Sequence, residues 1–332
     1  MSHQEHIEGA ADEADAGADV ESGAAAGAAG TDSSAARSDY RAGFVSFVGR
    51  PNVGKSTLTN ALVGEKIAIT SPKPQTTRRA IRGIAHRDNG QLIIVDTPGL
   101  HRPRTLLGER LNALVEATLG DVDVIGFCVP ANEKLGPGDR FINERLNDFP
   151  RAKKVAVLTK VDEASNSEVI DQLTRLGELR EWDAVVPISS VTREQLDVLT
   201  EVLLGLMPVS PPLYEAEQTT DEGEDDRIAE LIREAALEGV RDELPHSLAA
   251  TVEDREERED GLLEIYANLY VERDSQKGII IGHRGSRLRD VGERARHEIQ
   301  ALLGRRIYLS LRVKVLKEWQ RDPKALGKLG FN

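Results

Sequence analysis

The residues from Gly49 to Ser56, Gly-Arg-Pro-Asn-Val-Gly-Lys-Ser, match the pattern GxxxxGK[ST]. They stand between an apolar segment of strand type, Gly43–Val48, and a segment of helical type, Thr57–Val63. A strand, a glycine-rich turn and a helix form the context in which such a loop binds phosphate groups. The glycines let backbone N–H groups close around an anion, and the following helix points its positive end at it. The motif therefore predicts a nucleotide phosphate site in an α/β domain.

Two charged or polar positions of this loop and a second motif predict the metal chemistry. Lys55 is placed to supply charge to the β- and γ-phosphates, and Ser56 a hydroxyl to Mg²⁺. The tetrapeptide Asp96-Thr97-Pro98-Gly99 follows the apolar strand segment Leu92–Val95. A carboxylate there can hold the Mg²⁺ shell, while Gly99 gives a backbone N–H close access to the γ-phosphate.

Two further segments predict which base the site prefers. Thr159-Lys160-Val161-Asp162 follows the strand segment Lys154–Leu158. Asp162 can accept two hydrogen bonds from N1–H and the amine of guanine, which adenine does not offer together. The stem of Lys160 can pack on the base plane. Ser189-Ser190, after the strand segment Ala184–Pro187, would complete the base pocket, so we expect GTP and GDP as ligands.

Strand-like and helix-like segments alternate from Gly43 to about Leu206, which favours a parallel sheet covered on both faces. We expect an α/β domain with a mostly parallel, doubly wound sheet. Its further buried strand is Val122–Val129, and its helices are Thr105–Leu119, Asp139–Leu146, Glu168–Leu179 and Glu194–Leu206.

A second, smaller domain is predicted after the prolines of Pro208–Pro212, which end the last helix. An acidic run, Glu215–Asp226, leads into it. Its segments follow in the order α-β-β-α-α-β, with the helix Arg227–Glu243, the strands Ser247–Arg255 and Leu262–Arg273, a helix before Gly285, the helix Ser286–Leu303 and the strand Arg306–Val315. We expect a disordered tail at 1–40, a nucleotide-binding domain at 41–207, a linker at 208–226 and the second domain at 227–332.

Charge is unevenly distributed along this chain of net charge −13. The tail of residues 1–40 is acidic and rich in Ala and Gly, a composition that cannot bury enough apolar surface to fold. Residues 261–332 instead carry eight acidic and 15 basic side chains, and an acidic overall charge therefore does not exclude a nucleic-acid partner. The lone cysteine, Cys128, predicts no intramolecular disulfide and is interpreted as a small buried side chain. No apolar run reaches the length of a membrane span and no signal-peptide pattern is found, so we expect a cytoplasmic protein.

Gly282-His283-Arg284-Gly285 fits the GxxG loop with which KH domains clamp a nucleic-acid backbone. The pattern also occurs at Gly27–Gly30 and Gly327–Gly330, so its context carries the weight. This copy follows three isoleucines and precedes a basic helix that carries Arg287, Arg289, Arg294 and Arg296. We predict an RNA contact by Gly282, His283, Arg284, Gly285, Arg287 and Arg289. Trp319 is interpreted either as a base-stacking side chain or, by preference, as part of the core.

Taken together, the Gly49–Ser56 loop, the segment Pro74–Arg78, Asp-Thr-Pro-Gly-Leu-His at 96–101 and the KH-like module resemble the Era family of bacterial GTPases over residues 42–331. The resemblance implies a P-loop GTPase domain followed by an α+β type II KH domain, and a partner in small-subunit ribosomal RNA near its 3′ end during 30S assembly. It implies that Thr77, or else Thr76, is the Mg²⁺-binding threonine of switch I, about Thr70–Arg79. We expect a monomer; the resemblance also implies loose association with the inner membrane face, which the acidic tail would oppose.

The resemblance also bears on hydrolysis, because Leu100 follows Gly99 where many small GTPases carry a water-orienting Gln. Relatives with this replacement use the loop asparagine, here Asn52, to bind K⁺, which supplies positive charge to the transition state. We therefore assign catalysis to Asn52, Lys55, Thr77 and Gly99, and Mg²⁺ to Ser56, Thr77 and Asp96. The assigned nucleotide contacts are Gly49, Arg50, Pro51, Asn52, Val53, Gly54, Lys55, Ser56, Thr57, Asp96, Thr97, Pro98, Gly99, Thr159, Lys160, Asp162, Ser189 and Ser190.

Two positions depart from the family pattern. Relatives usually have Asn where Thr159 stands and Ser-Ala where Ser189-Ser190 stand, which predicts weaker base affinity with guanine preference kept by Asp162. Two alternatives stay open from the sequence: a signalling GTPase whose C-terminal domain binds a protein, and an RNA-binding scaffold impaired in hydrolysis.

Overall fold

The computed structural model describes residues 39–71, 73, 76–99, 103, 105–240 and 244–331, which belong to one compact unit. The tail predicted to be disordered lies outside the described residues except for Asp39 and Tyr40. Leu100 and His101 also lie outside them, as do Pro74 and Gln75 of the predicted switch I.

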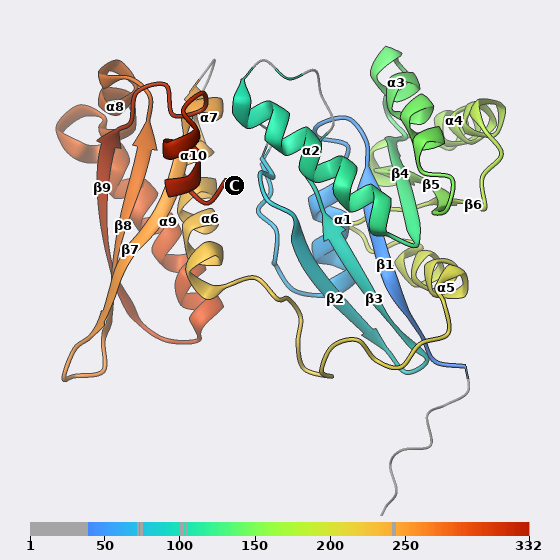
Figure 1. Ribbon diagram of the computed structural model, residues 1–332, viewed down its shortest axis with the longest axis horizontal. Coiled ribbons are helices and arrows are strands. Elements are labelled where there is room, and N and C mark those ends of the chain that lie inside the picture. The colour runs from blue at the N-terminus through green and yellow to red at the C-terminus, as the bar shows by residue number, and fades with distance from the viewer. Residues whose placement is uncertain are drawn as a thin grey trace, which may run out of the picture. The chain divides into compact units, whose positions relative to one another are not determined.

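A six-stranded sheet carries the phosphate loop (Figure 1). Its strand order is β2-β3-β1-β4-β5-β6, and every pair is parallel except the antiparallel pair of β2 and β3. The strands are β1 (Arg41–Val48), β2 (Ile81–Arg87), β3 (Gly90–Asp96), β4 (Val124–Pro130), β5 (Lys153–Thr159) and β6 (Ala184–Pro187). All seven residues of β3 and of β4 are buried, as expected for central strands covered on both faces.

Helices cover both faces of this sheet and bury two separate apolar clusters. The helices are α1 (Lys55–Val63), α2 (Leu106–Asp121), α3 (Pro137–Arg145), α4 (Asn166–Leu179) and α5 (Leu196–Leu206). Leu58 of α1 and Leu199 of α5 belong to one cluster, whereas Val115 of α2 and Leu176 of α4 belong to the other. The predicted doubly wound α/β architecture is therefore confirmed.

The two edge strands differ from the sequence analysis. Strand β2 was not predicted, because Arg82, His86 and Arg87 interrupt its apolar pattern; at a sheet edge these polar side chains can reach solvent. The segment Ala184–Pro187 does form β6, but its prediction as a buried strand was wrong. Val186 is its one buried residue and Val185 is 37% exposed, because no further strand pairs with that edge among the described residues.

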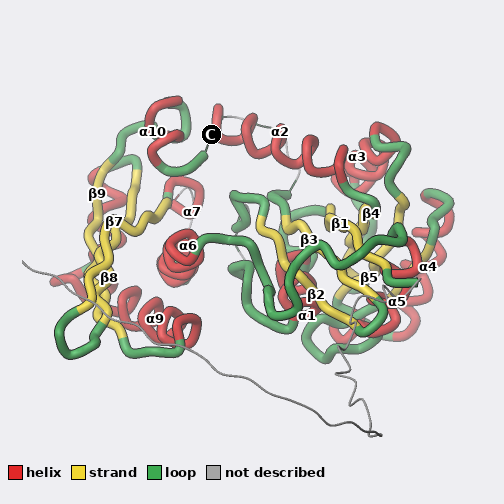
Figure 2. The backbone as a smooth tube through the Cα atoms, turned by 60° about the horizontal axis from the view of Figure 1, so that its bottom comes forward, coloured by secondary structure: helices red, strands yellow, loops and turns green. Residues whose placement is uncertain are grey.

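A second sheet of order β7-β8-β9 builds the C-terminal module (Figure 2). Strand β7 (Ala249–Glu257) pairs antiparallel with β8 (Leu263–Val271), and β8 pairs parallel with β9 (Ile307–Val315). The helices are α6 (Glu224–Leu237), α7 (Leu244–Ser247), α8 (Asp274–Ile281), α9 (Ser286–Leu303) and α10 (Pro323–Lys328). Side chains of α6, α8 and α9 share one apolar cluster with the sheet, and the principal elements follow the predicted order α-β-β-α-α-β.

The predicted helix Arg227–Glu243 is shifted toward the N-terminus in the structure. Helix α6 takes in Glu224, Asp225 and Asp226, the end of the acidic run, in its first turn, where carboxylates interact favourably with the helix dipole.

The segment between the two modules lies against the first sheet. Val209 forms a bridge with Arg41, and Thr220 forms one with Gly83 of β2. The amide of Gln91 accepts hydrogen bonds from the backbone N–H groups of Leu213 and Tyr214. The acidic linker is thus fixed to the edge of the six-stranded sheet.

Candidate nucleotide site and nucleic-acid loop

The backbone of the phosphate loop depends on two glycines. A Cβ on Gly49 would lie 2.5 Å from the carbonyl oxygen of Cys128 on β4, so only glycine lets the loop leave β1 this closely. Gly54 adopts φ +96° at the start of α1, in the left-handed region that disfavours other residues.

Cys128 itself is buried, and burial raises the pKa of its thiol to about 12. Its burial confirms its prediction as a small buried side chain.

Lys55 is folded into the loop that precedes it. Its ammonium donates to the carbonyl oxygens of Gly49 at 3.2 Å and Arg50 at 3.1 Å, and the residue is only 8% exposed. Burial lowers the pKa of Lys55, and the nearby Asp96 carboxylate partly opposes this shift. A cation held in this loop with carbonyl oxygens as its partners can turn to an arriving phosphate.

Three oxygen ligands from separate segments meet beside the loop. Ser56 Oγ donates to Asp96 Oδ2 at 2.7 Å, Thr77 Oγ1 donates to the same oxygen at 3.2 Å, and the two hydroxyls are 3.1 Å apart. Asp96 Oδ1 is buried without a hydrogen-bond partner among the described residues, and burial raises the pKa of the Asp96 carboxyl. A buried carboxylate beside two hydroxyls suits a hard divalent cation such as Mg²⁺.

The two neighbouring threonines take different positions. Thr76 Oγ1 donates to the carbonyl oxygen of Lys73 at 2.7 Å, within its own segment. Thr77 is 8% exposed and faces Ser56 and Asp96. The structure therefore brings Thr77, rather than Thr76, to the predicted Mg²⁺ ligands.

A cavity of about 370 Å³ opens beside these groups. The predicted residues among its lining are Pro51, Asn52, Gly54, Lys55, Ser56, Thr57, Thr77, Thr97, Gly99 and Lys160. Asn52 has φ +65°, a conformation that Asn tolerates better than most residues. Ile69 also lines the cavity, although no motif in the sequence singles it out.

Several predicted nucleotide contacts are engaged elsewhere. Arg50 forms ion pairs with Asp139 at 2.8 Å and Glu133 at 3.1 Å and does not line the cavity. Val53 is 1% exposed and belongs to the apolar cluster under the sheet. These side chains shape the loop, while their backbone still forms part of it.

The hydroxyl of Thr159 joins the base segment to the phosphate loop. Thr159 Oγ1 donates to the carbonyl oxygen of Val53 at 2.7 Å and lies 3.3 Å from that of Val129 on β4. The residue is 1% exposed, so this hydroxyl acts as a brace between β4, β5 and the loop. The sequence predicted weaker base affinity from Thr159 but not this contact.

The other predicted base-pocket residues lie near the ends of β5 and β6. Lys160 has φ +58° and lines the cavity, while Asp162 is exposed in the single turn that follows. Ser189 is buried and its Oγ accepts from the N–H of Thr192 at 3.0 Å, which holds the loop after β6; Ser190 is half-buried. The N–H of Val161 donates to the carbonyl of Ile188 at 3.3 Å, so the two segments lie side by side.

The second glycine loop connects α8 to α9. Gly282 has φ +72°, and a Cβ there would lie 2.7 Å from Cβ of Arg287. Arg284 and Gly285 also have positive φ, which produces a sharp turn. His283, Arg284 and Arg289 carry the side chains predicted to meet RNA, and all three are exposed, whereas Gly285 is half-buried.

Arg287 differs from the other predicted RNA contacts. Its Nη2 donates to the carbonyl oxygen of Glu238 at 2.8 Å, and burial lowers the pKa of its guanidinium. The structure therefore gives Arg287 a partner at the end of α6 in addition to its place next to the loop.

Trp319 is fully buried, and its Nε1 donates to the carbonyl oxygen of Ser247 at 3.0 Å. The base-stacking interpretation of this residue was wrong, and the core interpretation is confirmed.

Among the described residues, no helix combines the length and apolar character that a membrane span requires.

Comparison with known proteins identifies both modules. Residues 44–160 match the family described as 50S ribosome-binding GTPase, and residues 243–320 match the KH domain family. GTPase Era of Leifsonia xyli is 73% identical over 295 residues, which cover 88% of this chain and 99% of that relative. This chain belongs to the Era family of GTPases.

Other Era proteins extend this comparison. GTPase Era of Streptomyces coelicolor is 58% identical over 302 residues, covering 88% of this chain and 95% of that protein. The crystal structure of a single-residue variant of Aquifex aeolicus Era bound to GDP·AlF4⁻ matches with a TM-score of 0.84 at 34% identity. A crystal structure of Era in complex with MgGDPNP and nucleotides 1506–1542 of 16S ribosomal RNA matches with a TM-score of 0.83 at 34% identity. Both structures cover 88% of this chain and 99% of their own.

Proposed function

We propose that this Era-family GTPase is a molecular switch that binds the 3′ region of 16S ribosomal RNA through its KH module and acts in assembly of the 30S subunit. The observation that carries the switch is the meeting of Thr77 and Ser56, which line the nucleotide cavity, with the buried Asp96 beside it. Thr77 comes from a loop and the other two from a helix and a strand, so a ligand that binds all three orders the loop. The relative that was crystallised with MgGDPNP and 16S rRNA nucleotides supports the choice of RNA.

The residues of the site divide the work of phosphoryl transfer. Lys55 and the backbone of the Gly49–Ser56 loop orient the β- and γ-phosphates, and Asp162 selects guanine. Ser56, Thr77 and Asp96 would hold Mg²⁺, which supplies positive charge to the phosphate oxygens. Leu100 offers no side-chain hydrogen bond to the attacking water, so the water depends on backbone groups near Gly99.

Asn52 is the proposed ligand for K⁺ in this site. It lines the nucleotide cavity at the position where the loop bends through φ +65°, and its amide oxygen is the kind of neutral oxygen donor that suits a monovalent cation. K⁺ held there would supply positive charge as the phosphoryl group transfers. Hydrolysis should therefore be faster in KCl than in NaCl of equal ionic strength, and Asn52→Ala should abolish the difference. Equal wild-type rates in the two salts would contradict the role of K⁺.

Base selection can be tested by one substitution. Asp162→Asn replaces a double acceptor with a group that presents one acceptor and one donor, so GTP should bind more weakly and xanthosine triphosphate more tightly. Competition with a fluorescent GTP analogue measures both affinities. Unchanged GTP affinity would contradict the assignment of Asp162.

The switch itself is tested by RNA binding. An oligonucleotide of the 16S rRNA 3′ end should bind more tightly with GDPNP than with GDP in potassium buffer. Binding that is indifferent to nucleotide would contradict a switch, and binding to a protein partner with no RNA affinity would favour the signalling alternative.

A monomeric state and loose association with the inner membrane face stay predictions of the family resemblance.

A further inference from the structure

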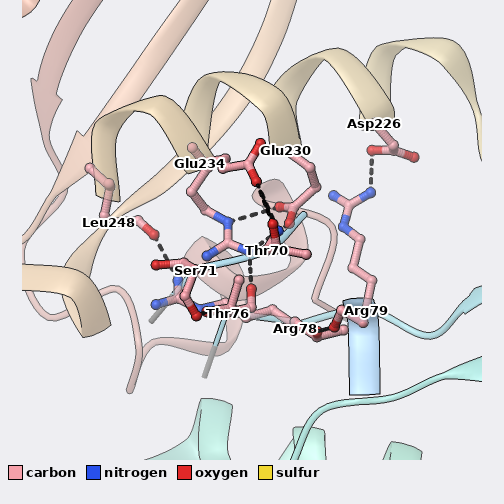
Figure 3. A network of polar contacts seen from close by, with 12 residues as sticks. Thr70, Ser71, Thr76, Arg78, Arg79, Asp226, Glu230, Glu234 and Leu248 are labelled. Carbon is pink, nitrogen blue, oxygen red and sulfur yellow. Dashed lines mark hydrogen bonds and ion pairs between the residues drawn. The ribbon is translucent and has the colours of Figure 1, made fainter. Parts of the chain in front are cut away.

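The arginine that follows the Mg²⁺-facing threonine is buried in the KH module. Arg78 is 1% exposed, and its guanidinium donates to the carbonyl oxygens of Leu248 at 2.7 Å, Pro245 at 2.9 Å and His246 at 2.8 Å (Figure 3). Its Cζ lies 5.7 Å from the ring centroid of the buried Trp319. One residue after Thr77, switch I is therefore anchored in the other module.

Arg79 reaches the last residues of the described chain. Its Nη2 donates to the carbonyl oxygen of Leu329 at 3.3 Å, and its Cζ lies 6.0 Å from the ring centroid of Phe331. Gly330 has φ +79°, and a Cβ there would lie 2.5 Å from Arg79 Nη2. The guanidinium also forms an ion pair with Asp226 of α6, as Figure 3 shows.

The same C-terminal residues hold the start of α2, which follows the Asp96–Gly99 motif in the chain. The N–H of Leu107 donates to the carbonyl oxygen of Gln320 at 3.0 Å, and Arg110 donates to the carbonyl oxygen of Phe331. Leu107 and Leu111 share a buried cluster with Trp319, Ala325, Leu326, Leu329 and Phe331. We call residues Trp319–Phe331 the C-terminal clasp.

Helix α6 binds two further residues of switch I, Thr70 and Thr76. Arg233 donates to the carbonyl oxygen of Thr76 and pairs with Glu230, and the N–H of Thr70 donates to Glu234 Oε1 at 2.8 Å (Figure 3). Thr76 and Arg78, the two neighbours of Thr77 in the chain, are thus both bound by the KH module. A shift of that module must therefore move Thr77.

This docking is suited to reversal. Arg78 is buried against carbonyl oxygens and an aromatic ring, and its Nε is buried without a hydrogen-bond partner among the described residues. Burial and, next, the positive charge of Arg233 lower the pKa of its guanidinium to about 9, and each nearby carboxylate opposes this shift less than Arg233 adds to it. Burying a guanidinium on such partners is costly, and this cost offsets part of the free energy that burial of the apolar cluster around the clasp contributes to docking. A ligand that binds Thr77 in one arrangement only can shift such an equilibrium.

We propose that the C-terminal clasp positions switch I for GTP hydrolysis. Its Trp319 packs on Arg78, which the carbonyl oxygens of Pro245, His246 and Leu248 bind, and its Leu329 accepts from Arg79. These contacts keep the Thr77 hydroxyl beside Ser56 and Asp96, and loss of the γ-phosphate contacts releases Thr77 and undocks the clasp. Arg78, Arg79 and the clasp residues are positioning residues, because none of them lines the nucleotide cavity. The inference rests on the proposed GTP switch and adds the part of the chain through which the KH module acts on it.

Coupling of this kind is reciprocal. If clasp docking favours Thr77 in the site, a nucleotide that binds Thr77 favours clasp docking by the same factor. The proposal therefore predicts that a substitution in the clasp changes GTP hydrolysis and that a change of bound nucleotide changes docking of the clasp.

The first experiment replaces one residue of the clasp and measures the affinity for GDPNP and the rate of GTP hydrolysis. Phe331→Ala removes the ring that faces Arg79 and lies far along the chain from the phosphate loop. We expect GDPNP affinity to fall about tenfold, within the usual range of allosteric coupling, and kcat for GTP to fall as well, while GDP affinity stays within about twofold. Phe141→Ala is the matched control, because Phe141 of α3 is a 44% exposed ring outside the clasp and should leave kcat unchanged.

A second variant separates positioning from folding. Arg78→Lys keeps the positive charge but cannot bind three carbonyl oxygens in a fork, so kcat should fall further than in Phe331→Ala, with GDP affinity kept. GDP affinity reports an intact nucleotide module in both variants. An unchanged kcat in both, or a parallel loss of kcat and GDP affinity, would overturn the proposal. A wild-type chain without GTP hydrolysis would instead contradict the proposed function.

The third measurement follows the clasp directly. The chain has two tryptophans, so Trp182→Phe leaves Trp319 as the single reporter. Trp182 stacks on Phe127 at 5.5 Å, and phenylalanine preserves that stack. Trp319 emission should shift to longer wavelength when GDP replaces GDPNP. Identical emission in the two nucleotides would contradict release of the clasp.

Discussion

The two glycine loops of this protein turn the chain in similar ways but treat their charged side chains differently. Gly49–Ser56 and Gly282–Gly285 both lead into a helix, and each contains a glycine on which a Cβ would lie within 2.7 Å of a neighbouring atom. In the first loop Lys55 is buried on two carbonyl oxygens, whereas Arg284 of the second is exposed. A loop with inward charge suits a small ligand that it encloses; a loop with outward charge suits a polymer that passes over it.

The largest effect is expected from removing the enclosed charge. Lys55→Ala removes the ammonium that is proposed to bind the β- and γ-phosphates. If two charge-assisted hydrogen bonds worth roughly 1.5–3 kcal/mol each are lost, GTP affinity should fall by about 100-fold or more. Titration with a fluorescent GTP analogue measures the loss. RNA affinity without nucleotide should not change. GTP binding within a few-fold of wild type would remove the distinction between the loops.

A carboxylate in the open loop should give the next largest effect. Gly282→Asp places a negative charge at the phosphate contact and a Cβ against Arg287, so affinity for the rRNA oligonucleotide should fall about 10- to 100-fold. GTP affinity and the basal hydrolysis rate should stay unchanged. Gly282→Ala carries the steric cost alone, and the difference between the two variants isolates the charge. Wild-type RNA affinity in Gly282→Asp would show that RNA binds elsewhere.

A single outward charge should matter less. Arg284→Ala removes one candidate phosphate contact, which predicts a few-fold loss of RNA affinity and a salt dependence whose slope falls by about 1. Arg305→Ala is the matched control, because Arg305 pairs with Glu257 at 2.8 Å and lies beyond the C-terminal end of α9. Equal losses in both variants would indicate a general effect of positive charge.

The linker between the loops offers the smallest effect. Burial raises the pKa of Glu222 to about 7, with Arg79 opposing the shift and Asp226, Glu230 and Asp221 adding to it. The folded state therefore binds more protons than the unfolded state between about pH 4.5 and 7, so this contribution to stability is full below pH 4.5 and is lost as pH rises through 7. Glu222→Gln should reduce the difference in unfolding free energy between pH 5 and pH 8 by an amount on the order of 1 kcal/mol. Denaturant titrations at both pH values measure it; an unchanged difference would show that Glu222 titrates normally.

Local patterns in the sequence predicted the features that depend on neighbouring residues. The buried strands β3 and β4 each follow from a short stretch of chain, and the structure confirms them. The Gly49–Ser56 loop likewise lies between a strand and a helix, as its motif predicted. Strand β2 was missed because its stability comes from pairing with β3, which no periodicity of Ile81–Arg87 reveals.

Contacts between distant residues were beyond sequence reasoning. Arg78 was expected only as part of the switch segment, but its partners stand 167–170 residues further along the chain. The brace formed by Thr159 likewise depends on a carbonyl 106 residues away. Neither side chain carries a local signal of burial, since Arg and Thr are most often exposed.

The brace at Thr159 bears on how GDP can leave. Because its hydroxyl binds the phosphate loop, and β5 pairs with β4, the phosphate half and the base half of the pocket form one rigid wall. A second wall of the cavity, formed by Ile69, Thr70, Ser71, Lys73, Thr76 and Thr77, belongs to the segment that the KH module contacts at Thr70 and Thr76. We therefore expect bound nucleotide to leave by movement of that second segment rather than by separation of the phosphate loop from the base segment.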